Sequence, residues 1–123
     1  MKYIIAALMI FSFSSCEKEA TGYGNCTIGV SNSTPTRYYL QVLLDDKDAG
    51  HFFVEASQTG NYTSSLLCND LVYTANLDNV TILTYVSSGK HTFKLKDSNT
   101  GAIKSSGEFT MTADGCISKQ VNF

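Results

Sequence analysis

The strongest constraint on the fold of this chain is a repeated pattern of short runs in which apolar and polar side chains alternate. In residues 91–96 (HTFKLK), for example, a phenylalanine and a leucine alternate with two lysines. A period of two is that of a β-strand, whose successive side chains point to opposite faces of a sheet. No window of about 11 residues has the apolar period of a helix. Strands are expected at residues 26–31, 38–44, 51–54, 80–86, 91–96, 108–112 and 116–123.

Residues that favour turns separate these runs at intervals of about ten residues, a spacing typical of antiparallel sandwiches and barrels. Residues 45–50 (DDKDAG) lie between two apolar runs and predict a hairpin. Pro35, the single proline, falls in a loop at residues 32–36, where its missing N–H interrupts no ladder. We therefore predict an all-β chain that forms a single antiparallel β-sandwich.

The N-terminus has the three-part layout of a secretory signal. Lys2 supplies a positive charge, residues 3–11 (YIIAALMIF) form a short apolar run, and small serines precede Cys16. The apolar run is shorter than the roughly 20 residues that a membrane-spanning helix needs, so a cleaved signal peptide is expected.

The end of this segment, Ser14-Ser15-Cys16, resembles the lipobox of bacterial lipoproteins, in a form similar to that of Bacteroidota. The resemblance implies that the Cys16 thiol receives a diacylglycerol and that Cys16 becomes the first residue of the mature chain. Two or more acyl chains anchor a protein stably to a membrane. The alternative is cleavage by ordinary signal peptidase near Ser15, which would leave Cys16 available for a disulfide.

Residues 17–19 (EKE) resemble the signal that sends some Bacteroidota lipoproteins to the outer face of the outer membrane. We therefore expect a lipid-anchored protein of the bacterial cell envelope, in the outer membrane and exposed at the surface. The expected domains are a signal peptide at 1–15, a flexible tether at 16–25 and a β-sandwich domain at 26–123. The length of that last segment suits one domain with an ordinary core.

Charge and cysteine content exclude several kinds of partner. The formal net charge is −2 at pH 7, and no cluster of Lys and Arg offers the phosphate contacts that nucleic acid needs. No two cysteines have the spacing of zinc ligands, and the only histidines are His51 and His91. Residues 45–48 (DDKD) lack the full pattern of a calcium loop and indicate a solvated turn. We expect no metal and no cofactor.

Three cysteines follow Cys16, namely Cys26, Cys68 and Cys116. An exported chain can form disulfides, and an odd number leaves one thiol over. We prefer Cys26–Cys116, because these residues begin the first and last strands, which run side by side and parallel in many small sandwiches. The alternation pattern places Cys26 with apolar residues and Cys116 with polar ones, so this pair needs a bulge or an irregular strand start. Cys68–Cys116 is the alternative.

A catalytic function has weak support. His51 or His91 could activate a serine only if the fold brought it within hydrogen-bond reach of that serine and of a carboxylate. No Gly-x-Ser-x-Gly motif is present, and we expect no enzyme activity.

Aromatic side chains are the candidates for a binding surface. In the adjacent pairs Tyr38-Tyr39 and Phe52-Phe53, one ring is expected to face the core and the other to face outward. Outward rings could bind a protein or stack on a glycan, and rings that lie in one plane would favour the glycan. The candidates are Tyr38, Tyr39, Phe52, Phe53, Tyr62, Tyr73 and Tyr85.

Most of the mature chain resembles small Bacteroidota lipoproteins with an immunoglobulin-like or transthyretin-like sandwich. The resemblance rests on residues 26–31, 38–54 (YYLQVLLDDKDAGHFFV), 86–101 (VSSGKHTFKLKDSNTG) and 113–123 (ADGCISKQVNF), and the hairpin and the SGKH turn are also similar to PEGA-type surface domains. It implies a fold and a location without a shared catalytic activity. We expect a membrane-anchored envelope lipoprotein with a non-catalytic binding, adhesion or scaffold role. The alternative is an envelope inhibitor or immunity-type lipoprotein that binds a specific enzyme.

Overall fold

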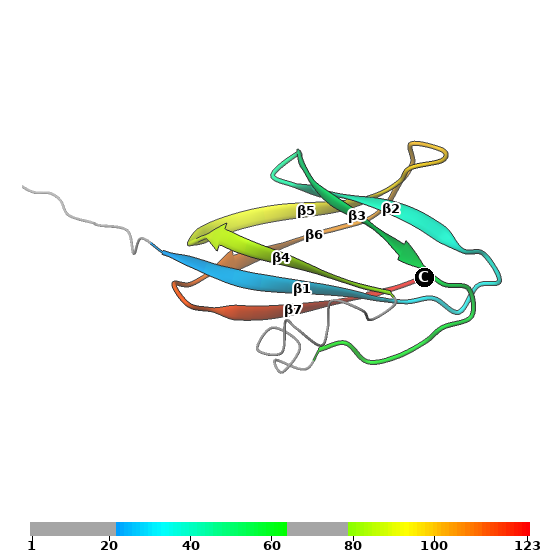
Figure 1. Ribbon diagram of the computed structural model, residues 1–123, viewed down its shortest axis with the longest axis horizontal. Coiled ribbons are helices and arrows are strands. Elements are labelled where there is room, and N and C mark those ends of the chain that lie inside the picture. Colours follow the sequence, from blue (N-terminus) through cyan, green and yellow to red (C-terminus); the bar gives the residue numbers. More distant parts are fainter. Residues whose placement is uncertain (1–21, 64–78) are drawn as a thin grey trace, which may run out of the picture.

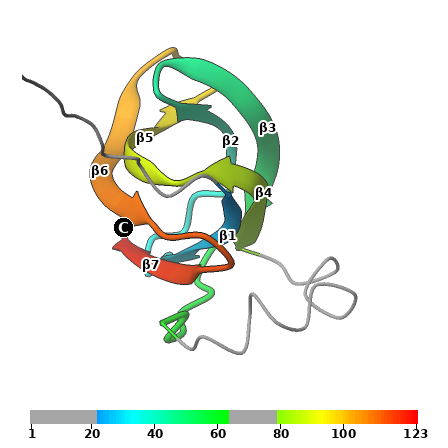
Figure 2. The same ribbon diagram turned by 90° about the vertical axis from the view of Figure 1, so that its left-hand side faces the viewer.

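The computed structural model describes residues 22–63 and 79–123, which form two β-sheets packed face to face (Figures 1 and 2). One sheet has the strand order β4-β1-β7 and the other the order β3-β2-β5-β6. The described part of the chain contains no helix. The prediction of an all-β sandwich is therefore confirmed. The strands are β1 (Tyr23–Ser31), β2 (Tyr38–Leu44), β3 (Lys47–Val54), β4 (Val80–Ser87), β5 (Gly89–Asp97), β6 (Ile103–Met111) and β7 (Cys116–Asn122).

The first and last strands run side by side and parallel, as expected, whereas the other strand pairs in the described residues are antiparallel. β1 lies between β4 and β7 and begins at Tyr23, so the folded domain starts earlier than the predicted boundary at residue 26. The reason is that Tyr23 pairs with Ser87 at the end of β4, a long-range contact that extends the strand into the expected tether.

The core lies between the two sheets and consists of the apolar side chains that alternate along each strand. Burying a side chain such as Leu or Val stabilises the fold by roughly 1.5–3 kcal/mol. The fully or nearly fully buried members are Cys26, Ile28, Val30, Leu40, Val42, Val54, Leu83, Val86, Phe93, Leu95, Phe109, Met111 and Val121.

The preferred disulfide, Cys26–Cys116, is wrong. Cys26 is a free, fully buried thiol, and Cys116 is disulfide-bonded elsewhere. In the parallel ladder Cys116 lies opposite Asn25, while Cys26 lies opposite Ile117. Because neighbouring residues of a strand point to opposite faces, this offset turns Cys26 into the core and Cys116 away from it. Cys68 lies outside the described residues, so the pair Cys68–Cys116 stays a prediction.

Candidate functional site

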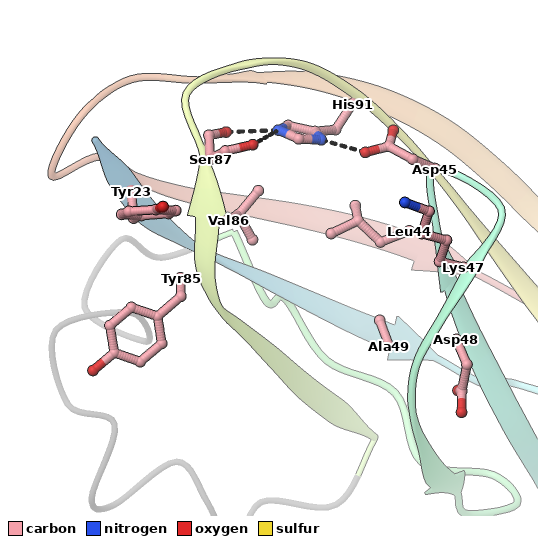
Figure 3. A pocket seen from close by; sticks show the side chains of 10 residues that line it. All are labelled: Tyr23, Leu44, Asp45, Lys47, Asp48, Ala49, Tyr85, Val86, Ser87 and His91. Atoms are coloured by element: carbon pink, nitrogen blue, oxygen red, sulfur yellow. Dashed lines mark hydrogen bonds and ion pairs between the residues drawn. The ribbon is translucent and has the colours of Figure 1, made fainter. Parts of the chain in front are cut away.

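A histidine bridge joins the two sheets at the end of the sandwich where β1 begins (Figure 3). The Nδ1 atom of His91, on β5, is 2.6 Å from Oδ2 of Asp45 in the β2–β3 turn. The Nε2 atom of His91 is 2.6 Å from the backbone carbonyl oxygen of Ser87, at the end of β4. Asp45 is held in turn by the N–H of Thr92, which donates to Oδ1 at 2.9 Å.

Both nitrogens of the His91 ring act as donors in this geometry. A carbonyl oxygen can only accept, so Nε2 carries a proton, and Nδ1 donates to a carboxylate. Burial opposes the charged ring, but the hydrogen bonds to Asp45 and to Ser87 prevail and raise the pKa of His91 above its ordinary value. The hydrogen bond from His91, followed by that from the Thr92 N–H, lowers the pKa of Asp45.

This arrangement brings together a histidine, a serine and a carboxylate, which is the contact pattern that a hydrolase needs. The hydroxyl oxygen of Ser87, however, is 3.4 Å from Nε2, and the carbonyl of the same residue is nearer. A general base must accept a proton from its nucleophile, and Nε2 is instead committed as a donor to that carbonyl. The chemistry of the cluster is therefore that of an inter-sheet clamp.

The aspartates at and just after the β2–β3 turn each have a local partner. Asp46 pairs with Lys94, with Nζ and Oδ1 2.7 Å apart, and Asp48 accepts the N–H of Gly50 at 3.0 Å. Among the residues the structure describes, no three His, Cys, Asp or Glu side chains gather into a group that could hold a metal ion.

Two exposed tyrosines flank a cavity of about 360 Å³ beside this clamp (Figure 3). Tyr23 is 60% exposed and Tyr85 is 82% exposed, and their rings meet edge to face with centroids 6.5 Å apart. Tyr85 has a φ of 55°, a backbone conformation that a bulky side chain rarely adopts. It belongs to a bulge in β4, because the β1–β4 register shifts between Gly24 and Cys26.

A second aromatic group lies on the outer face of the four-stranded sheet, and we call it the outer-face stack: Arg37, Phe53, Tyr39 and His51. The guanidinium carbon of Arg37 is 4.0 Å from the centroid of the Phe53 ring. The Tyr39 ring lies between its neighbours, with its centroid 4.4 Å from that of Phe53 and 5.2 Å from that of His51. The Tyr39–His51 pair is stacked at 20° and the Tyr39–Phe53 pair is tilted at 32°.

The register of the hairpin creates this stack. Tyr39 pairs directly with Phe53, and Gln41 pairs with His51, so the three rings fall on one face of β2 and β3. Glu55 extends the group, because its Oε2 atom is 2.8 Å from Nε of Arg37.

The predicted aromatic residues therefore separate into different places. Tyr38 and Phe52 pack against the core, while Tyr39 and Phe53 face outward, which confirms the expectation for both adjacent pairs. Tyr85 lies with Tyr23 at one end of the sandwich.

Tyr62 belongs to no strand; it packs against β1 and β7 of the other sheet and does not join the outer-face stack. Its backbone N–H donates to Oε1 of Gln120 on β7 at 2.7 Å, and its ring packs where a Cβ at Gly29 would lie. Three other candidates, Cys16, Cys68 and Tyr73, lie outside the described residues.

Sequence reasoning missed Tyr23, Arg37 and the Asp45–His91 contact. Tyr23 falls within the expected tether, and the contacts of Arg37 with Phe53 and of Asp45 with His91 join residues that are far apart in the chain. No local pattern signals them, because they depend on which strands pair and in which register.

Comparison of the chain with protein-family models, with curated proteins and with solved structures found no match. Within residues 22–63 and 79–123, no helix has the length and apolar character needed to cross a membrane.

Proposed function

We propose that this chain is a lipid-anchored, non-catalytic binding module of a bacterial cell envelope, and that its partner is a protein. The outer-face stack is the observation that carries the proposal. Phe53 is 46% exposed, and it lies between the exposed guanidinium of Arg37 and the Tyr39 ring. Aromatic residues and arginine are the side chains most enriched at the centres of protein interfaces.

A protein suits this surface better than a glycan because of how the rings are oriented. A sugar stacks on a free aromatic face, and rings that lie in one plane offer such faces side by side. Here the rings stack on one another, and the guanidinium of Arg37 lies over Phe53. What the stack presents outward is aromatic surface beside the Arg37–Glu55 ion pair, which suits a protein surface of mixed apolar and polar character.

The same face of the sheet also carries an exposed apolar side chain and a lysine on β5 and β6. Lys96 on β5 pairs in register with Gln41 and with Ile103, which is 49% exposed. Lys96 has no ion-pair partner among the described residues. We therefore propose a partner surface that sets apolar side chains against Phe53 and Ile103 and a carboxylate against Lys96.

The anchoring half of the proposal rests on the lipobox-like ending at Cys16. The alternative of an inhibitor or immunity-type lipoprotein would be favoured by a large apolar or acidic patch. Asp45 and Asp46 are each neutralised by a partner, so the acidic turn does not offer such a patch.

Two measurements test the proposal. Intact mass of the membrane fraction should show a chain that starts at Cys16 and carries acyl chains, and Cys16→Ala should lack them. A chain that starts elsewhere without acyl chains would overturn the anchoring.

For the binding face, a photoreactive phenylalanine analogue is placed at position 53 in intact cells, with position 100, in the β5–β6 turn, as the control. We expect a discrete, protease-sensitive adduct from position 53 that is absent from position 100 and is lost when Arg37→Glu and Lys96→Glu are added. Equal adducts from both positions, or an adduct that resists protease, would contradict a protein partner at this face.

A further inference from the structure

The tyrosine pair, Tyr23 and Tyr85, lies at the end of the sandwich where the described chain begins (Figure 1). Both rings are largely exposed, at 60% and 82% of their surface. Neither ring belongs to the core cluster or to the outer-face stack. These rings therefore contribute little buried apolar surface to the stability of the fold, and they are available to contact a partner outside the domain.

The backbone conformation of Tyr85 also indicates that this pair contacts a partner. A bulge in β4 holds Tyr85 at a positive φ, which costs free energy in a bulky L-residue. Bulges redirect side chains, and here the redirected ring projects away from the sandwich into solvent (Figure 3). The strained backbone at Tyr85 places the ring in solvent and adds nothing to the core, which indicates that the ring itself makes a contact with a partner.

The short chain between Cys16 and Tyr23 limits how far this end of the sandwich can be from a lipid anchor at Cys16. The segment from Cys16 to Tyr23 spans at most about 25 Å even when fully extended. An anchor at Cys16 therefore holds this end of the sandwich near the bilayer surface. β1 has nine residues and extends about 30 Å from this end, so the β5–β6 turn at the opposite end lies that much farther from the point where the tether joins the sandwich.

We propose that Tyr23 and Tyr85 form a membrane-contact site that inserts into the headgroup layer of the bilayer that holds the acyl chains. This inference rests on the proposed lipid anchor. A tyrosine ring is apolar with a polar hydroxyl, and tyrosines gather at membrane–water interfaces for that reason. The occupant of this end of the sandwich is thus a lipid surface.

The charges around the pair nearly cancel. Lys47 and Asp48 line the cavity beside the tyrosines, and Asp45 is paired with His91. Asp114 lies next to Tyr23, since its N–H donates to the Tyr23 carbonyl at 2.8 Å. Asp114 leaves one carboxylate in excess, so these groups do not attract anionic lipids, and the contact should depend on the aromatic rings and should not strengthen with the anionic lipid content.

The experiment uses the absence of tryptophan from the sequence. In the full-length, membrane-extracted protein, Tyr85→Trp places a single fluorophore at the site, and Thr100→Trp places one at the opposite end as the matched control. Each protein is reconstituted into phosphatidylcholine vesicles with and without lipids brominated on the acyl chains. We expect the Tyr85→Trp emission to shift to the blue and to be quenched by the brominated lipid, and the Thr100→Trp emission to do neither.

The outcomes separate this inference from the proposed function. Acyl chains on Cys16 by intact mass, together with Tyr85→Trp emission that is quenched no more than that of Thr100→Trp, would overturn the membrane-contact site alone. Absence of the acyl chains would overturn both proposals. Tyr23→Trp provides a second reporter if Tyr85→Trp fails to fold, and its emission should also be quenched.

Discussion

His91 is held from both sides by groups that belong to different sheets. Nδ1 donates to Asp45 in the turn between two strands of the four-stranded sheet, and Nε2 donates to the Ser87 carbonyl on β4 of the other sheet. Both bonds require a doubly protonated ring, so the charge of this one side chain is coupled to the folded state.

We predict that the protein loses stability as the pH rises above neutrality. The raised pKa of His91 means that its contribution is fully present below the ordinary histidine value of about 6.5 and is lost as the pH rises through the folded-state value. The lowered pKa of Asp45 means that its contribution is present above about pH 4 and is lost as the pH falls through its lowered value. The pair therefore stabilises most between about pH 4 and 6.5.

Urea midpoints at about pH 5.5 and about pH 9 would measure this effect, since these values lie on either side of the histidine transition. The urea midpoint of the wild-type protein should be lower at about pH 9 than at about pH 5.5. His91→Gln should remove most of this difference. His51→Gln removes the exposed histidine of the outer-face stack and should keep the wild-type difference. An unchanged difference in His91→Gln would contradict the clamp.

Cys26 shows what burial does to a thiol. It has no exposed surface, and burial, opposed only by Lys119, raises its pKa to about 12. The reactive form of cysteine is the thiolate, which is scarce at neutral pH under these conditions. We predict that Cys26 resists iodoacetamide in the folded protein and is alkylated once urea unfolds the chain. Peptide mapping without reductant would locate the label, and modification of Cys26 in native buffer would contradict the structure.

At the scale of elements, the loop between β1 and β2 is organised by one buried side chain. Asn32 donates from Nδ2 to the carbonyls of Thr36 and Glu55, at 2.7 and 3.1 Å. Its Oδ1 accepts the N–H and the hydroxyl of Thr34, at 3.0 and 2.7 Å. This amide ties the loop to the end of β3, next to Arg37, and so supports the hairpin that carries the outer-face stack.

We predict that Asn32→Ala lowers the free energy of unfolding by about 3 kcal/mol, because it removes four hydrogen bonds made by a fully buried side chain and leaves a cavity in its place. Asn99→Ala, at an exposed position of the β5–β6 turn, should change it by less than about 0.5 kcal/mol. Chemical denaturation of both variants measures the difference. Equal, small losses would mean that Asn32 does not organise the loop.

At the scale of the whole molecule, the two proposed contact surfaces lie on different parts of the sandwich. The tyrosine pair lies where β1 begins, and Arg37 and Phe53 lie where β2 begins and β3 ends, near the opposite end (Figure 1). A domain seated on the membrane through Tyr23 and Tyr85 would hold Arg37 and Phe53 away from the bilayer, where a protein partner can reach them.

Much of this architecture follows from local sequence. The alternation in residues 38–44 and 91–96 predicted β2 and β5, and the adjacent pairs Tyr38-Tyr39 and Phe52-Phe53 divided between core and surface as expected. Residues 45–50 predicted the hairpin, but its turn is shorter than expected, because β3 begins at Lys47. These features depend on neighbours within a few residues, because a strand places successive side chains on opposite faces whatever it pairs with.

Local alternation was sufficient to predict the β-sandwich class and the approximate places of the seven strands, although β1, β3 and β6 each begin three to five residues earlier than expected. The anchored, exported chain stays a prediction from the N-terminal residues. Which side chains meet depends on the three-dimensional fold: Tyr23 contacts Tyr85, and His91 contacts Asp45 and Ser87. The fold also buries Cys26 in the core as a free thiol instead of bonding it to Cys116. Each of these contacts depends on the register between strands that are distant in the chain. A shift of one residue in that register would turn every side chain of a strand to the opposite face, and the local pattern of residues does not specify it.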